Sequence, residues 1–212
     1  VSQSAVSRVF TPGASASKKT IEKVRKAAKE LGYRPNVLAR AMVSGKSGII
    51  GLVVAYLNNQ YYPEALEKLT NALQDRGYHV LVFLASHAAG NIDRVVEEIL
   101  DFQVDGIIAA SVALSSDLSA RCQTAGVPMV LFNRARDDQS MSAVTSDNIA
   151  GGRKAAEFLL AGGHEKIGYI AGWEGASTQR DREAGFTAEL AAAGKTLHAR
   201  EVGNFVTEEA QA

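Results

Sequence analysis

Four side chains near the start of the chain carry hydrogen-bonding groups at a spacing that would place them together. Projected as an α-helix at about 100° per residue, they occupy one arc: Gln3, Ser4, Ser7 and Arg8. The opposite arc is apolar and would dock on a protein core: Ala5, Val6, Val9 and Phe10. Ser2 could cap this helix by accepting a backbone N–H. The polar arc could therefore bond a closely approaching partner, although this stretch alone favours a simple solvated face.

The distribution of charge adds a second clue. Residues 1–46 carry ten Lys or Arg and two Glu, a net charge of +8, whereas residues 47–212 carry 13 basic and 21 acidic residues, a net charge of −8. This asymmetry indicates a head that binds a polyanion, joined to an acidic body. A membrane surface could also attract a basic head, but the sequence has no lipidation motif, signal segment or long apolar run.

The residue types that usually perform catalysis or bind metals are sparse and scattered. Cys122 is the only cysteine, which excludes an intrachain disulfide and a thiolate cluster. The histidines lack the spacing of metal ligands: His79, His87, His164 and His198. The sequence also lacks a nucleophile elbow, an acid–base pair and a glycine loop with phosphate-binding spacing. We therefore predict no catalytic residue, no metal, no cofactor, and a cytoplasmic protein.

The basic head predicts short helices. One is expected after Ser17, a suitable N-cap, and should stop at Gly32. Its apolar stripe consists of Ile21, Val24, Ala28 and Leu31. Two short helices cannot make a full core, so a third is expected before Val1, with the chain truncated at its start. Residues 36–43 allow two further helical turns, followed by the flexible linker SGKSG.

The rest of the chain alternates apolar runs with amphipathic helices. Strands are expected at residues 48–55, 78–85, 105–111, 127–133, 142–146 and 166–172. Helices are expected between and after them, at residues 63–77, 91–103, 116–126, 149–162 and 178–194. Such an alternation requires crossovers and predicts a doubly wound α/β sheet. Ligands of these sheets bind at the carboxyl ends of the strands.

The stretches VSRVF, ELGYRPN and AR, with their spacing, closely resemble the head of the bacterial lactose-repressor/galactose-repressor family. The resemblance implies a small all-α helix-turn-helix head whose first helix is missing, a hinge helix, and a periplasmic-binding-protein-like α/β body with an incomplete second subdomain. It therefore implies truncation at both ends. The implied boundaries are 1–34 for the partial head, 35–47 for the hinge helix and linker, 48–146 for the first effector-binding subdomain and 147–212 for part of the second.

The resemblance also assigns DNA contacts, position by position. They are Ser2, Gln3, Ser4, Ser7 and Arg8 in the head, and Asn36, Ala39 and Met42 in the hinge helix. Gln3 and Ser4 stand where the family has its base-reading pair, and Ser2 and Ser7 fall at phosphate-contacting positions. The chemistry agrees, since Gln can bond adenine, Arg can bond guanine and Ser can bond either base. Met42 replaces the family's usual leucine wedge and could still part a base step in the minor groove.

An effector site in the body is implied in the same way. Its residues are Asn59, Tyr61, Tyr62, Asn133, Asp147 and Arg182. The two tyrosines offer flat faces for a sugar or base ring, and Arg182 could fork onto hydroxyls or a carboxylate. Simpler roles are open for several of them: Asp147 suits a helix N-cap, Asn133 suits a turn, and the tyrosines suit packing at a helix start.

The implied function is a transcriptional regulator, most often a repressor, located in the bacterial cytoplasm and at the nucleoid when bound to DNA. A homodimer or dimer of dimers would bind a pseudo-palindromic operator in double-stranded DNA. A small molecule, most commonly a sugar, would control the operator affinity. An alternative is a periplasmic-type solute-binding protein, against which the basic head argues strongly. A third, an α/β enzyme, lacks an acid–base pair.

Overall fold

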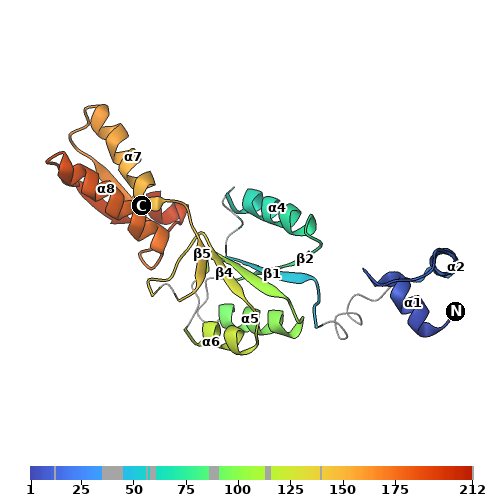
Figure 1. Cartoon of the computed structure of the whole chain (residues 1–212). Helices are drawn as coiled ribbons and strands as arrows, with labels where there is room; N and C mark the ends of the chain where they lie inside the picture. The colour runs from blue at the N-terminus through green and yellow to red at the C-terminus, as the bar shows by residue number, and fades with distance from the viewer. Residues whose placement is uncertain are drawn as a thin grey trace. The chain divides into compact units, whose positions relative to one another are not determined.

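The computed structural model describes residues 1–11, 13–34, 45–55, 57, 61–85, 91–112, 116–138 and 140–211. The chain forms two compact units, Val1–Ser47 and Gly48–Ala212, which we describe separately and call the head and the body. The head contains α1 (Gln3–Phe10) and α2 (Lys18–Glu30) (Figure 1).

The two helices described in the head, α1 and α2, begin at the residues that the sequence predicts. The Ser2 hydroxyl accepts the Ala5 N–H at 3.3 Å, and the Ser17 hydroxyl accepts the Thr20 N–H at 3.2 Å. Each side chain thus satisfies one of the N–H groups that a helix start leaves without a backbone partner. Gly32 follows the end of α2 with a φ of 63°, which confirms it as the predicted stop.

A small apolar contact joins α1 to α2. Val24 is 6% exposed, and the rings of Phe10 and Tyr33 lie 5.7 Å apart. The expectation that Leu31 completes the apolar stripe is wrong, because Leu31 is 81% exposed. Leu31 lies one residue beyond the last helical residue of α2, where Phe10 packs against Tyr33 instead.

The body contains a five-stranded sheet in the order β2-β1-β3-β4-β5. Its strands are β1 (Ile49–Val54), β2 (His79–Leu84), β3 (Gly106–Ala110), β4 (Met129–Phe132) and β5 (Ser142–Val144). The connecting helices are α4 (Tyr61–Gln74), α5 (Asn91–Asp101) and α6 (Ser116–Thr124). Every paired strand is parallel to its neighbour, which confirms the predicted α/β fold.

Helices cover both faces of this sheet, with α4 on one face and α5 and α6 on the other (Figure 1). Strand β1 shows how the sequence specifies these layers, since its side chains alternate between the two faces. Leu52 and Val54 pack in the cluster that contains Tyr62 of α4. Val53 packs in the cluster that contains Ile99 of α5. A strand buried on both sides reads as a continuous apolar run, as residues 49–54 do.

The chain after β5 forms a second, two-stranded parallel sheet of β6 (Gly168–Ala171) and β7 (Ala199–Val202). Its helices are α7 (Asn148–Ala161), α8 (Ser177–Ala192) and α9 (Thr207–Gln211). The sequence did not predict β7, whose four residues include Arg200 and Glu201 and are mostly exposed. Among the described residues, no helix is both long and apolar enough to span a membrane.

Two glycines let α7 and α8 pack with their backbones in close contact. A Cβ atom on Gly152 would clash with the carbonyl group of Arg182, and one on Gly185 would clash with the carbonyl group of Ile149. This packing fixes the position of Arg182 relative to the start of α7. It also explains Gly152 as a packing position in a helix.

Candidate functional site

All five residues of the head that were predicted to contact DNA lie in α1 or at its N-cap, Ser2. Ser2, Gln3, Ser4, Ser7 and Arg8 are exposed. The residues predicted for the opposite arc are each partly buried: Ala5, Val6, Val9 and Phe10. The structure therefore confirms the predicted division of this helix into a polar and an apolar face.

The polar face of α1 is ordered by local hydrogen bonds. The hydroxyls of Ser2 and Ser4 lie 3.1 Å apart, and Arg8 Nε donates to the carbonyl oxygen of Ser4 at 3.3 Å. The terminal guanidinium nitrogens of Arg8 make no hydrogen bond to a described residue, so they remain free to donate to a partner.

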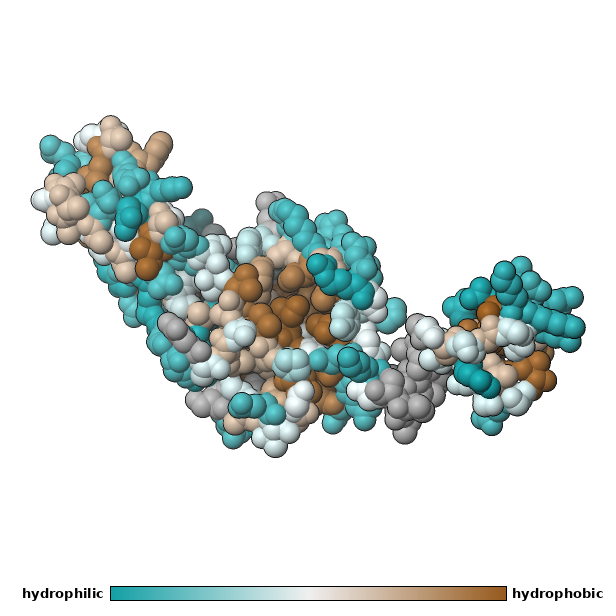
Figure 2. Space-filling model, viewed as in Figure 1, coloured by the Kyte–Doolittle hydropathy of each residue, from teal (hydrophilic) through white to brown (hydrophobic). Residues whose placement is uncertain are grey.

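Helix α2 supplies most of the positive charge of the head. Its basic residues are all exposed: Lys18, Lys19, Lys23, Arg25, Lys26 and Lys29. An ion pair in the described part of the head joins Lys26 to Glu30 at 3.9 Å, and both side chains are well exposed. A pair of this kind is screened by water and salt, so it leaves the head strongly cationic. The side chains around α2 give a largely hydrophilic surface in Figure 2.

Four predicted contact residues lie outside the described part of the chain. They are Asn36, Ala39 and Met42 of the expected hinge helix, and Asn59 of the expected effector site.

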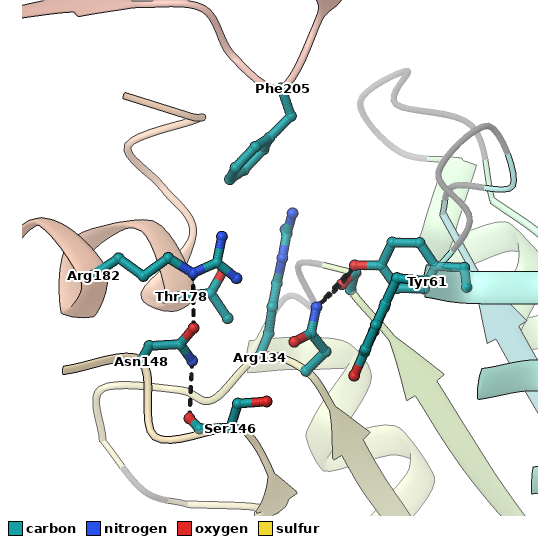
Figure 3. A pocket seen from close by; sticks show the side chains of 10 residues that line it. Tyr61, Arg134, Ser146, Asn148, Thr178, Arg182 and Phe205 are labelled. Carbon is teal, nitrogen blue, oxygen red and sulfur yellow. Dashed lines mark hydrogen bonds between the residues drawn. The ribbon is translucent and has the colours of Figure 1, made fainter. Parts of the chain in front are cut away.

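The body holds a cavity of about 340 Å³ at the carboxyl ends of its parallel strands (Figure 3). Its lining residues are Tyr61, Tyr62, Ser111, Asn133, Arg134, Ser146, Asn148, Thr178, Arg182 and Phe205. The structure thus brings together four of the predicted effector residues, Tyr61, Tyr62, Asn133 and Arg182. The volume suits a small organic ligand, at the lower end of the usual range.

A buried polar cluster forms one wall of the cavity. Asn133 Nδ2 donates to Tyr62 Oη at 2.9 Å and to Ser111 Oγ at 3.2 Å, and the hydroxyls of Tyr62 and Ser111 are hydrogen-bonded to each other. Ser111 follows β3 and Asn133 follows β4, with positive φ angles of 56° and 64°. This turn of the backbone directly after each strand is tolerated well by Asn and is uncommon for Ser. Adjacent parallel strands end at the same edge, so the two side chains meet.

The facing wall is built from the start of α7 and the first two turns of α8. Arg182 Nε donates to Asn148 Oδ1 at 2.8 Å, and Asn148 Nδ2 donates to the carbonyl oxygen of Ser146 at 2.9 Å. The prediction that Asp147 faces the ligand gains no support, because Asp147 is not among the lining residues. Its carboxylate accepts the Ala150 N–H at 2.9 Å and caps α7. Its neighbour Asn148, which the sequence reasoning missed, lies in the cavity wall instead.

Arg134 is a second missed residue of the cavity. It is 8% exposed, and its guanidinium lies 5.1 Å from the centre of the Trp173 ring. A cation over an indole face is stabilised by the ring electrons. Figure 3 shows Arg134 and Arg182 entering the cavity from different sides, beneath the Phe205 ring. The position directly after Asn133, at the end of a strand, was the signal that could have identified Arg134.

Aromatic rings complete the lining. One face of Tyr61 stacks on Phe132, with ring centroids 6.2 Å apart and an angle of 8° between the planes, and Tyr61 is still 43% exposed. Burial raises the pKa of the Tyr61 phenol, and the nearby Tyr62 raises it further. The hydroxyl of Tyr61 is therefore neutral at physiological pH and can donate a hydrogen bond. Phe205, which the sequence reasoning missed, lies against Gly172, where a Cβ atom would clash with its ring.

The side chains that line the cavity can bind a small polar ligand. Amides, hydroxyls and guanidiniums can hydrogen-bond a polar ligand, and Tyr61 and Phe205 can cover its apolar faces. Of the ten lining residues, the charged ones are Arg134 and Arg182. Among the described residues, no group of three or more His, Cys, Asp or Glu could hold a metal ion.

Two family models match the chain. The model "Bacterial regulatory proteins, lacI family" matches residues 1–36, and "Periplasmic binding proteins and sugar binding domain of LacI family" matches residues 47–211. The maltose regulon regulatory protein MalI of Escherichia coli (strain K12) is 31% identical over 199 residues, which cover 93% of this chain and 58% of MalI.

Solved structures of regulators resemble both units. The lac repressor dimer bound to operator and the anti-inducer ONPF matches 99% of this chain and 64% of that chain, with a TM-score of 0.85 and 25% identity. The complex of the transcriptional regulator CelR with cellobiose matches the same shares, with a TM-score of 0.70 and 28% identity. The chain thus spans less than two thirds of the length of these relatives.

Proposed function

Because this chain belongs to the LacI family of bacterial regulatory proteins, we propose that it is a DNA-binding transcriptional regulator controlled by a small-molecule effector. The observation that carries the proposal is the face of α1, on which Gln3, Ser4, Ser7 and Arg8 are all exposed while the opposite face packs. Repression is the expected direction of control, because MalI is a regulon regulator and several similar proteins are named operon repressors.

In this proposal α1 is the recognition helix and enters the major groove of DNA. Gln3 can form two hydrogen bonds with adenine, and the free guanidinium nitrogens of Arg8 can form two with guanine. The exposed cations of α2 attract the phosphate backbone, and the N-terminus of α1 beside Ser2 is suited to a phosphate. The predicted hinge residues Asn36, Ala39 and Met42 would add contacts in the minor groove.

The proposed effector site is the cavity of the body, and its ligand is proposed to contain a sugar. MalI is a maltose regulon regulator, and CelR was solved with cellobiose. In this chain the aromatic ring of Tyr61 can contact a sugar ring, while Asn133 and Arg182 can bond its hydroxyls.

Ligand binding can bias the body because the cavity joins the two sheets. Tyr62, Ser111 and Asn133 line it from the first sheet and its helix, whereas Arg182 lines it from α8. Two contacts beside the cavity connect the same elements. Ala135 N–H donates to Ser177 Oγ at 3.0 Å, and Arg180 pairs with Asp137. A ligand that favours one angle between the sheets would shift the population of the DNA-binding form.

We propose that the regulator is a homodimer and that the edge strand β2 takes part in pairing. Val82 and Leu84 on this strand are 47% and 60% exposed. Apolar side chains on an unpaired sheet edge are a surface that another protein covers. Figure 2 shows hydrophobic side chains gathered over the sheet of the body.

The remaining parts of the proposal follow from the family. The expected domains are a head at 1–34, a hinge and linker at 35–47, and effector-binding subdomains at 48–146 and 147–212. The protein is proposed to act in the bacterial cytoplasm, as a regulator and not as an enzyme.

A salt titration of DNA binding tests the proposal. The protein's affinity for operator and random duplexes would be measured by fluorescence anisotropy between low and physiological ionic strength. The logarithm of affinity should fall steeply with the logarithm of salt concentration, because phosphate contacts release counterions. A protein that ignores duplex DNA at low salt but binds sugars would instead be a solute-binding protein, and the proposal would be wrong.

A further inference from the structure

Two arginines of the cavity make no ion pair with any described residue. Arg182 uses Nε for Asn148, and its terminal nitrogens donate to no residue of the described chain. Arg134 contacts the Trp173 ring and has no hydrogen bond or carboxylate partner among the described residues. A guanidinium carries five N–H donors, so most of the donors of this pair are unused.

The burial of Arg134 makes the unused charge significant. Arg134 is only 8% exposed. Removing a charge from water is costly unless an opposite charge or a set of hydrogen bonds compensates it. The Trp173 ring provides part of this compensation, and an anion in the cavity would provide the rest.

The carboxylates that follow Arg134 most closely in the sequence are engaged elsewhere. Asp137 pairs with Arg180. Asp138 pairs with Arg136 and also accepts two hydrogen bonds from Ser140. Asp147 caps α7 through the Ala150 N–H.

The backbone adds to the positive potential. Asn148 and Thr178 line the cavity from the first turns of α7 and α8, so both helices begin at this site. The N-cap of α8, Ala176, forms no side-chain cap, which leaves the first N–H groups of that helix available. A helix N-terminus stabilises a nearby anion.

We infer that the effector is an acidic sugar, whose carboxylate or phosphate binds between Arg134 and Arg182 while its ring lies against Tyr61. This inference rests on the proposed function for the regulatory role of the cavity. A planar guanidinium forms two parallel hydrogen bonds with either oxyanion, so the site chemistry is shared by both groups. Asn133 and Ser111 would bond the neutral hydroxyls of the ring.

The test compares matched neutral and acidic sugars. Each of several hexoses and disaccharides is added beside its uronate and its 6-phosphate, and the melting temperature of the protein is recorded. Ligand binding raises the melting temperature by mass action. We expect acidic members to raise it at concentrations where the parent sugars do not, and the comparison of uronate with phosphate identifies the oxyanion. Binding of neutral sugars alone, equal binding of both classes, or binding of none would overturn the inference.

Three variants locate the effect in the cavity. Arg134→Gln and Arg182→Gln should each weaken binding of the acidic sugar by about 10- to 100-fold, the value of a lost charged hydrogen bond. Asn133→Asp keeps the side-chain shape but adds a carboxylate, and should weaken acidic ligands more than neutral ones. Arg94→Gln removes an exposed guanidinium of α5 that pairs with Glu98, and should change nothing.

Operator affinity without ligand separates the two proposals. Each variant is first tested for binding to operator DNA, which the cavity substitutions should leave intact. Loss of operator binding in the unaltered protein would contradict the proposed function. Intact operator binding that responds to neutral sugars, with unchanged affinity in Arg134→Gln, would contradict only the acidic effector.

Discussion

Gly152 of α7 lies directly against the carbonyl group of Arg182 of α8, leaving no room for a Cβ atom. The reciprocal contact, between Gly185 and the carbonyl group of Ile149, makes the two helices touch at two points. This packing brings the Arg182 side chain within 2.8 Å of Asn148. The position of a side chain that lines the cavity thus depends on a glycine that does not line it.

Gly152→Ala should therefore reduce both stability and effector affinity. The added methyl group pushes α8 away from α7, which should cost about 1–3 kcal/mol of unfolding free energy, as overpacking usually does. Urea denaturation and ligand titration measure the two effects. Gly151→Ala is the matched control, since a Cβ atom there meets nothing within 4 Å. This control should stabilise the protein by about 0.5–1 kcal/mol through helix propensity. Equal behaviour of the two variants would contradict the packing argument.

Tyr62→Phe should destabilise the body and disturb the cavity. The lost hydroxyl accepts from Asn133 and bonds to Ser111, in a site where Tyr62 is 8% exposed. Removing one member of a buried hydrogen-bonded cluster should cost about 1–3 kcal/mol. Urea denaturation measures this loss. Tyr78→Phe is the control, because the Tyr78 hydroxyl bonds to no described residue. A loss as large in Tyr78→Phe would mean that the Tyr62 cluster contributes little.

The sequence predicted the strands of the body and the helix starts of the head well because their signals are local. The apolar run at residues 49–54 and the caps at Ser2 and Ser17 depend on neighbours within a few residues. Strand β7 was not predicted because its pairing with β6 depends on tertiary contact. Its own residues are mostly exposed, and two of the four are charged.

The cavity was predictable only in part, for a related reason. Asn133 could be identified because it follows a predicted strand. Arg182 could be identified because it lies in a segment that resembles the family's effector-binding segment. Arg134 and Phe205 did not, because their roles depend on Trp173 and Gly172, which the fold brings close to them. Asp147 and Asn148 are adjacent in sequence, and the direction in which each side chain points is set by the cap of α7.

Arg8→Ala should weaken operator binding selectively. If Arg8 bonds a base, the loss should be about 1–3 kcal/mol on the operator and much smaller on random DNA. Fluorescence anisotropy on both duplexes at fixed salt measures the difference. Arg76→Ala, at an exposed arginine of the body beyond α4, is the control and should leave both affinities unchanged. An equal loss on the two duplexes would identify Arg8 as a phosphate contact.

Leu84→Lys should dissociate the proposed homodimer. Leu84 is 60% exposed on the edge strand β2, and an ammonium group in an apolar interface loses its hydration. Analytical ultracentrifugation should show a shift toward monomer, accompanied by weaker binding to a two-half-site operator. Gln123→Lys, on the exposed surface of α6, introduces the same charge at a distance from β2 and should leave the dimer intact. An unchanged dimer in Leu84→Lys would place the pairing surface elsewhere.

Glu183 should make the stability of the body depend on pH in the acidic range. Its carboxylate accepts hydrogen bonds from Arg200 and from Gln179 Nε2 at 3.0 Å, and Arg200 first, then Gln179, holds its pKa below the usual value. A carboxyl group with a lowered folded pKa stabilises the protein above its unfolded pKa of about 4.3, and this contribution is lost as the pH falls through the folded pKa.

Glu183→Gln should therefore lower the unfolding free energy at pH 7 by about 1 kcal/mol, reduced by solvent screening at this partly exposed site. The difference from the unaltered protein should shrink below about pH 4.3, where the unfolded chain takes up the proton first. Urea denaturation across this range measures it. Arg200→Gln should remove the same pH dependence, and the double variant should lose less than the two single losses combined. Independent, additive losses would show that the pair does not act as one unit.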